Sequence, residues 1–287
     1  MGAIFRHELR NYFHSLTAYV FGAFLLAVVG LGSVLYNLQA AVSNFEFVLS
    51  FASIIFVVIV PILTMRTLAE ERRQRTDQLL YSLPITTTQV VLGKYLALLV
   101  VYLIPLAVIS LYPLLFSQFG DVYLPTSYGS LFAFFMMGAA LLAVGMFLSP
   151  LTDNQGFAAG IGIAAILLNY YSVSLAEYTS STAMGSLIAL YVIALLLGVV
   201  IRGLTRNENL AYGVTFALIA ALSVAYFVNS TAFEGLLPDI MTKLSLFRQF
   251  NSFVNGAFDL TAIVYYVSVM GFFLFLSVQS MEKRRYN

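Results

Sequence analysis

Long apolar stretches alternate with short polar segments along the whole chain, and this pattern predicts a bundle of membrane-spanning helices. A span needs about 20 mostly apolar residues, because a helix must cross about 30 Å of hydrocarbon with every backbone group bonded internally. The expected fold class is therefore an all-α polytopic membrane protein with eight spans by hydropathy. The stretches are 16–37, 47–66, 92–117, 128–149, 156–175, 183–201, 210–228 and 260–280.

The composition supports a membrane protein with one integral domain, residues 1–287. Hydrophobic residues make up 61% of the chain and charged residues 9%, against about 25% charged in soluble proteins. We find no linker and no repeat at solenoid spacing that would divide it. Cysteine is absent, which excludes disulfides and thiolate chemistry. A formal charge of +1 gives no reason to expect a nucleic-acid partner.

Two segments outside the spans have the periodicity of amphipathic helices. Residues 1–15 place Phe5, Leu9, Tyr12 and Phe13 on one stripe, which predicts an interfacial helix before the first span. Residues 229–260 contain further apolar stripes, with Pro238 suited to a first turn and Asp259 suited to cap the last span. We expect one or two short helices there, at the outer leaflet.

Basic residues predict the orientation, since Lys and Arg remain preferentially on the cytoplasmic side. With the N-terminus inside, only Lys243 and Arg248 of the 14 basic residues are outside. Both termini are then cytoplasmic, and the protein is expected in the cytoplasmic membrane. The inner set is Arg6, Arg10, Arg66, Arg72, Arg73, Arg75, Lys94, Arg202, Arg206, Lys283, Arg284 and Arg285.

The chemistry of an enzyme or of an ion-driven carrier is missing from this pattern. The sequence contains no H-E-x-x-H or G-x-S-x-G motif, and Gly93-Lys94 lacks the upstream glycine of a nucleotide-binding loop. No carboxylate falls within the eight stretches, which argues against coupling to protons or sodium. We therefore expect no catalytic, cofactor or metal residues, and any energy must come from a partner.

Residues 70–90 form the most polar part of the chain and suit a cytoplasmic attachment point. "EERRQRTDQLLYSLP" begins with acidic residues, continues with helix formers and stops at Pro84. A basic loop that only determines topology would explain the arginines, but it would not need Leu79, Leu80 and Leu83. The pattern favours a helix that docks on another protein.

At these residues the chain resembles a known family. "VPILTMRTLAEERRQRTDQLLYSLPITTTQVVLGKYLA", residues 60–97, resembles the signature of ABC-2 type transporter permeases. "SPLTDNQ" and "NGAFDLTAIVYYVSVMGFFLFLSVQSMEKRR" are similar to the gliding-motility type and its nitrous-oxide-operon relatives. The sequence departs from the family at Arg75, where a small residue is usual, and in the stretch 183–228, an extra transmembrane hairpin beyond six spans.

The resemblance implies a six-span permease core that forms the translocation path of an ABC exporter as a dimer, with a second copy or a paralogue. It also implies two copies of a separate ATPase subunit, which binds the ATP. The loop after the second span would be the coupling helix that docks on the ATPase. This role transfers to Glu70, Glu71, Arg72, Arg73, Thr76, Leu79, Leu80 and Pro84.

An alternative from another functional class stays open at this point. The same attachment would serve a non-transporting scaffold or mechanotransducer, in which ATPase strokes act on an extracytoplasmic auxiliary subunit through residues 229–260. Both functions need the cytoplasmic coupling segment, so the sequence does not separate them. The scarcity of charge in the spans, where only Arg66 and Lys94 occur and both lie near a cytoplasmic end, favours a hydrophobic cargo, or none.

Overall fold

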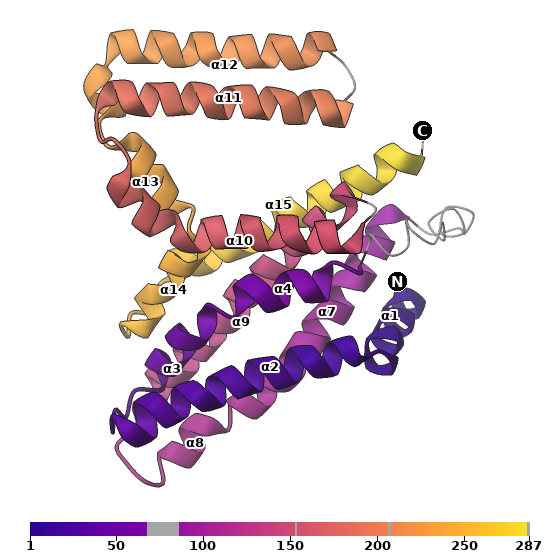
Figure 1. Ribbon diagram of the computed structural model, residues 1–287, viewed down its shortest axis with the longest axis vertical. Coiled ribbons are helices and arrows are strands. Elements are labelled where there is room, and N and C mark those ends of the chain that lie inside the picture. The colour runs from indigo at the N-terminus through magenta and orange to yellow at the C-terminus, as the bar shows by residue number, and fades with distance from the viewer. Residues whose placement is uncertain (68–85, 153, 206–207, 286–287) are drawn as a thin grey trace. The chain divides into compact units, whose positions relative to one another are not determined.

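The computed structural model describes residues 1–67, 86–152, 154–205 and 208–285, and all regular elements in these ranges are helices (Figure 1). The chain divides into two compact units. Unit 1 consists of Met1–Tyr170 and Gln249–Asn287, and unit 2 consists of Tyr171–Arg248. This architecture confirms the predicted all-α class of a polytopic membrane protein.

Unit 1 contains most of the long helices. Helix α10 (Gln155–Tyr178) begins in unit 1 and ends in unit 2, and α14 (Leu246–Val254) continues from unit 2 into unit 1. The other elements of unit 1 are α1 (Gly2–His14), α2 (Leu16–Ser33), η1 (Val34–Gln39), α3 (Phe45–Ser53), α4 (Phe56–Thr64), α7 (Thr87–Ile109), α8 (Tyr112–Phe116), α9 (Leu124–Leu148), η2 (Ser149–Leu151) and α15 (Leu260–Arg285).

The described helices reproduce the predicted apolar stretches closely. Six are long and apolar enough to cross a membrane, and a bent pair would make a seventh. The remaining stretch, 183–201, forms a helix whose described apolar part, Ala183–Val199, is shorter. The third stretch contains two prolines: α7 continues through Pro105, and Pro113 occupies the first turn of α8.

The second predicted span, 47–66, is broken into α3 and α4, which meet at an angle of 58°. At the break Ile55, Val57 and Val58 donate their backbone N–H groups to residues three positions earlier, so the turn there is tighter than an α-helix. Helices α2 and α3 pack closely at Gly32 of α2, because a Cβ there would lie only 3.1 Å from the Cγ1 atom of Val48 on α3. Both α3 and α4 still pack against α2 and α9 on either side of the break.

Helix α9 is the centre of unit 1 and contacts α3, α4, α7 and α15. Two tyrosines of α7 bind its backbone: the hydroxyl of Tyr95 donates to the carbonyl of Ala139 at 2.9 Å, and that of Tyr102 to Phe134 at 2.8 Å. The Tyr102 ring packs so tightly on α9 that a Cβ at Gly138 would be 2.5 Å from its hydroxyl oxygen. Small residues on α9 therefore permit close helix packing.

Unit 2 consists of two long helices and a group of short ones. Helices α11 (Ala183–Thr205) and α12 (Glu208–Val228) pack side by side (Figure 1), with Tyr191 and Ser223 hydrogen-bonded across the pair at 2.7 Å. The predicted hairpin 183–228 thus corresponds to two helices; whether both span the membrane stays a prediction. The short helices are η3 (Ser230–Phe233), α13 (Leu236–Lys243) and the start of α14.

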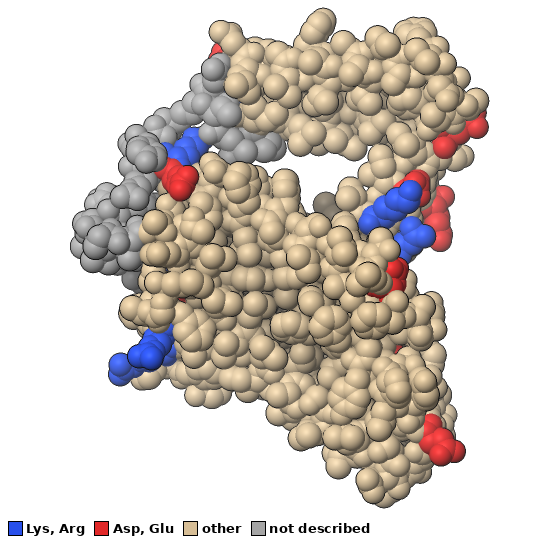
Figure 2. Space-filling model, turned by 180° about the vertical axis from the view of Figure 1, so that it is seen from behind, with Lys and Arg blue, Asp and Glu red and all other residues tan. Residues whose placement is uncertain are grey.

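The short helices expected between 229 and 260 are present. Pro238 lies in the first turn of α13, and Oδ1 of Asp259 accepts from the backbone N–H of Thr261 at 2.8 Å, which caps α15. The helix expected at 1–15 is α1, whose Tyr12 is buried. On the face seen in Figure 2 charged side chains gather at a few places and the surface is otherwise uncharged, as a lipid-facing protein requires.

Candidate functional site

The residues predicted to dock on a partner lie outside the described residues. Glu70, Glu71, Arg72, Arg73, Thr76, Leu79, Leu80 and Pro84 all fall within 68–85. The structure does describe the two places where this segment joins the bundle: the end of α4, up to Thr67, and the start of α7, from Thr86. We call this end of unit 1 the basic end, because Arg6, Arg10, Arg66, Lys94 and Lys283 belong to it.

The start of α7 is capped and held by α15. The side chain of Thr86 accepts from the backbone N–H of Gln89 at 3.3 Å, the usual role of threonine at a helix N-cap. The hydroxyl of Thr87 lies 3.5 Å from Oε1 of Glu282 near the end of α15. These two contacts hold the N-terminus of α7, which directly follows the segment 68–85.

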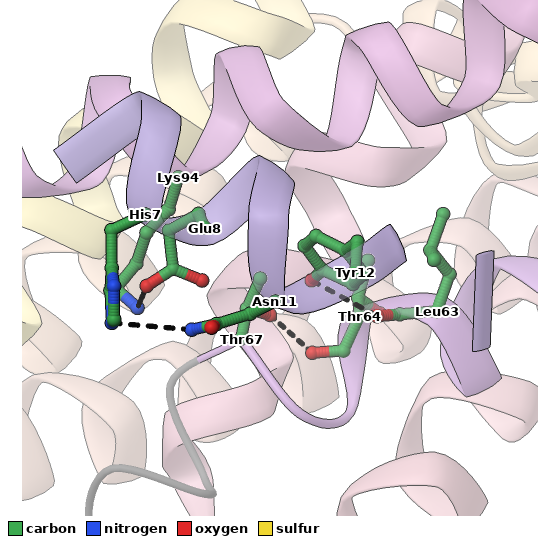
Figure 3. A network of polar contacts seen from close by, with 8 residues as sticks. All are labelled: His7, Glu8, Asn11, Tyr12, Leu63, Thr64, Thr67 and Lys94. Atoms are coloured by element: carbon green, nitrogen blue, oxygen red, sulfur yellow. Dashed lines mark hydrogen bonds and ion pairs between the residues drawn. The ribbon is translucent and has the colours of Figure 1, made fainter. Parts of the chain in front are cut away.

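The end of α4 is held from two sides. A helix leaves its last carbonyl groups without partners inside the helix, and side chains commonly supply them. The hydroxyl of Tyr12 on α1 approaches the carbonyl of Leu63 at 3.5 Å, and that of Ser149 donates to Met65 at 3.3 Å. Thr67 donates to the carbonyl of Thr64 (Figure 3). Helix α1 and the end of α9 thus contact the point where α4 stops.

A buried ion pair joins α1 to α7 (Figure 3). Nζ of Lys94 lies 2.7 Å from Oε1 of Glu8, and the side chains are 2% and 13% exposed. Removing one partner of such a pair leaves an uncompensated buried charge and typically costs about 3–5 kcal/mol. The pair therefore makes the contact between α1 and α7 specific, whatever its net contribution to stability.

The glycine before this lysine lets α1 come close. A Cβ at Gly93 would stand 3.1 Å from Cγ2 of Ile4 and 3.5 Å from the carbonyl oxygen of Met1. Gly93-Lys94, which the sequence excluded as a nucleotide-binding loop, has a structural role here. Gly93 provides room for α1, and Lys94 binds it.

Four helices therefore surround the two junctions of the segment 68–85. Helix α4 leads into the segment and α7 leads out of it. Helix α1 packs against α7 and reaches α4 through the hydroxyl of Tyr12, and α9 packs against both α4 and α7. These helices are connected by a buried ion pair, by helix caps and by close packing at glycine, and such contacts resist movement of one helix relative to another. The two described ends of the chain that flank residues 68–85 are therefore both held by neighbouring helices.

Sequence reasoning missed two buried ionisable residues. Lys94 was counted only as a cytoplasmic basic residue, although its partner Glu8 lies four residues before Tyr12 on the same predicted helix. Glu46, just outside the predicted span 47–66, is the second residue of α3 and is 2% exposed. The predicted stretch 47–66 left Glu46 out, whereas α3 begins two residues earlier, at Phe45, and includes this carboxylate.

The described residues contain no group of three or more His, Cys, Asp or Glu side chains that would hold a metal ion. Residues 31–184 match the family model described as ABC-2 family transporter protein. This match includes α3, α4, α7 and α9, the segment 68–85 and Lys94, whereas Glu8 precedes it. No curated protein and no solved structure matches the chain.

Proposed function

The chain belongs to the ABC-2 family of transporter proteins, whose model matches more than half of its 287 residues, and we propose that a separate ATPase drives it through residues 70–84. The family supports the role of a permease subunit in an ABC transporter, with an ABC ATPase as its partner. The proposed coupling residues are Glu70, Glu71, Arg72, Arg73, Thr76, Leu79, Leu80 and Pro84.

The observation that carries the proposal is the way both junctions of this segment are held. The contacts of α4 and α7 with α1 and α9 near the junctions support this proposal, because a push on residues 70–84 would then move both junctions together. Coupling requires such an element, whose position both the ATPase and the path influence. A loosely attached loop would absorb the same push by bending.

The finer parts of the proposal follow from the family. The permease works as a dimer, with a second copy or a paralogue, and two ATPase subunits bind and hydrolyse the ATP. The chain itself has no enzymatic role, both termini are cytoplasmic, and the direction of transport is export. The gliding-motility and nitrous-oxide-operon type permeases are the subfamily that the C-terminal motif favours.

Disrupting the coupling segment tests this function. The variants Glu71→Lys and Leu80→Asp should lose co-purification with the ATPase, or keep it and lose the link between ATP hydrolysis and transport in proteoliposomes. Ser82→Ala, in the same segment, is the matched control and should behave like the native protein. Native assembly and native transport in both disruptive variants would refute the proposed role.

A second candidate function has its own supporting observation. The end of α14 is bound to the central helix: the hydroxyl of Ser130 on α9 donates to the carbonyl of Phe253 at 2.9 Å, and the rings of Phe134 and Phe250 lie 5.9 Å apart. Movement of α9 would therefore reach the proposed extracytoplasmic side, where a mechanotransducer would need it. An ATPase rate that responds to cargo favours transport, whereas one that responds only to a bound outer subunit favours transduction.

A further inference from the structure

A carboxylate lies buried at the end of unit 1 opposite to the basic end. Glu46 belongs to the first turn of α3, beyond the turn that follows α2 and η1, and its residue is 2% exposed. Its Oε1 accepts from the side-chain amide of Asn44 at 3.2 Å, and its Oε2 accepts from the hydroxyl of Ser127 at 3.3 Å. Ser127, in the first turn of α9, is 1% exposed.

The partners of this carboxylate are neutral, and no described side chain forms an ion pair with it. The described basic side chains of unit 1 belong to α1, the residues after α4, the first part of α7 and the last part of α15. All of these lie at the basic end. A buried carboxylate is costly unless a positive charge or strong hydrogen bonds compensate it, and the two hydrogen bonds here are long.

The helix dipole compensates part of the charge, since Glu46 sits in the first turn of α3. That interaction is small beside the desolvation of a carboxylate that is nearly inaccessible to water. Ionisable residues inside membrane bundles usually mark a functional site for this reason. Arg248, on the neighbouring α14, also forms no ion pair with Glu46 among the described contacts, which leaves the charge open to a cation from solution.

We propose that Glu46, Ser127 and Asn44 bind a small monovalent cation such as Na⁺ or K⁺. A single carboxylate balances a single positive charge, whereas Ca²⁺ sites in proteins usually combine several carboxylate and carbonyl ligands. Carboxylate, hydroxyl and amide oxygens are the hard ligands that these ions prefer. The hydroxyl of Ser127 has lone pairs to offer, and the amide of Asn44 can turn its oxygen inward. The burial of Glu46 and Ser127 favours an inorganic ion over a bulky organic one.

This inference does not depend on an ATPase partner, so the purified full-length chain is sufficient to test it. Binding of radioactive ²²Na⁺ is measured directly, and thermal unfolding is followed by circular dichroism while NaCl or KCl replaces N-methyl-D-glucamine chloride at constant ionic strength. Circular dichroism is suited to this chain because it contains no Trp and no Cys for fluorescence methods. The native protein should bind the ion saturably and unfold roughly 5 °C higher at saturation.

Two variants and one control assign the effect to this site. Glu46→Gln should abolish saturable binding and the shift, and in cation-free buffer it should unfold no lower than the native protein. Ser127→Ala should raise the half-saturating concentration several-fold. Asp121→Asn removes an exposed carboxylate that precedes α9 in the chain and should leave the response unchanged.

The possible results separate the alternatives. No saturable ²²Na⁺ binding together with no salt-dependent shift for Na⁺ or K⁺ in the native protein overturns the proposal and leaves Glu46 with a role at the start of α3 only. A native-like response in Glu46→Gln also overturns it, because the ion then binds elsewhere. Should Glu46→Gln fail to fold, the native protein and Ser127→Ala decide the question.

Discussion

Gly145 of α9 lies directly against Thr64 at the end of α4. A Cβ at position 145 would stand 2.5 Å from the hydroxyl oxygen of Thr64 and 3.0 Å from its methyl group. The same hydroxyl donates to the carbonyl of Val60 at 3.0 Å, so the threonine side chain has little freedom to move away. This contact determines how closely the end of α4, just before the proposed coupling segment, approaches the central helix.

A methyl group at position 145 should therefore lower the free energy of unfolding of the protein. Gly145→Ala forces α4 and α9 apart, and overpacking of this kind costs about 1–3 kcal/mol. Unfolding followed by circular dichroism should show a midpoint lowered by several degrees. Gly129→Ala in the same helix has open space around the new Cβ and should be neutral or slightly stabilising. Equal effects of the two substitutions would contradict the close packing of α4 on α9.

The ion pair between Lys94 and Glu8 should behave as a buried pair in a double-mutant cycle. Lys94→Met alone should destabilise by about 3–5 kcal/mol, because it leaves Glu8 without its partner. The double variant Lys94→Met with Glu8→Gln should recover much of this loss, since neither charge remains.

An exposed pair provides the control for this cycle. Lys243 and Asp239 on α13 are also 2.7 Å apart, with side chains 69% and 51% exposed. Lys243→Met should change stability by less than about 0.5 kcal/mol. Additive losses in the Lys94 and Glu8 cycle would show that the two side chains do not act as a pair.

The pair of helices in unit 2 should depend on one glycine. A Cβ at Gly198 of α11 would lie 2.0 Å from the hydroxyl oxygen of Thr215 on α12, so Gly198→Ala must displace one helix from the other. Amide hydrogen exchange of peptides from 183–228 should become faster in this variant. Gly213→Ala on α12 meets nothing within 4 Å and should exchange as the native protein does. Unchanged exchange in Gly198→Ala would contradict the packing of α11 on α12.

The proposed orientation is open to a direct test, because the native chain has no cysteine. Single cysteines at Arg10 and Asp121 replace exposed residues at the basic end and at the opposite end of unit 1. A membrane-impermeant maleimide should label Asp121→Cys in intact cells and label Arg10→Cys only after permeabilisation. The reverse pattern would invert the proposed topology and place the coupling segment outside the cell.

Much of the fold was predictable from local patterns. Apolar stretches longer than a bilayer core formed helices where hydropathy placed them, and Asp259 capped the last helix as a short polar residue before an apolar run commonly does. The family was recognisable from the motif in residues 60–97, which lies inside the matched part of the chain. These features depend on residues that are near one another in sequence.

The amino-acid sequence alone was enough to identify a helical membrane protein of the ABC-2 family, with a polar segment between its second and third predicted spans. Only the tertiary structure decided the bend between α3 and α4, the pairing of Lys94 with Glu8 across 86 positions, and the burial of Glu46 beside Ser127. The physical reason is that hydropathy reports the solvent each residue prefers. Which charge meets which, and whether water reaches it, depends on helices that pack together from distant parts of the chain.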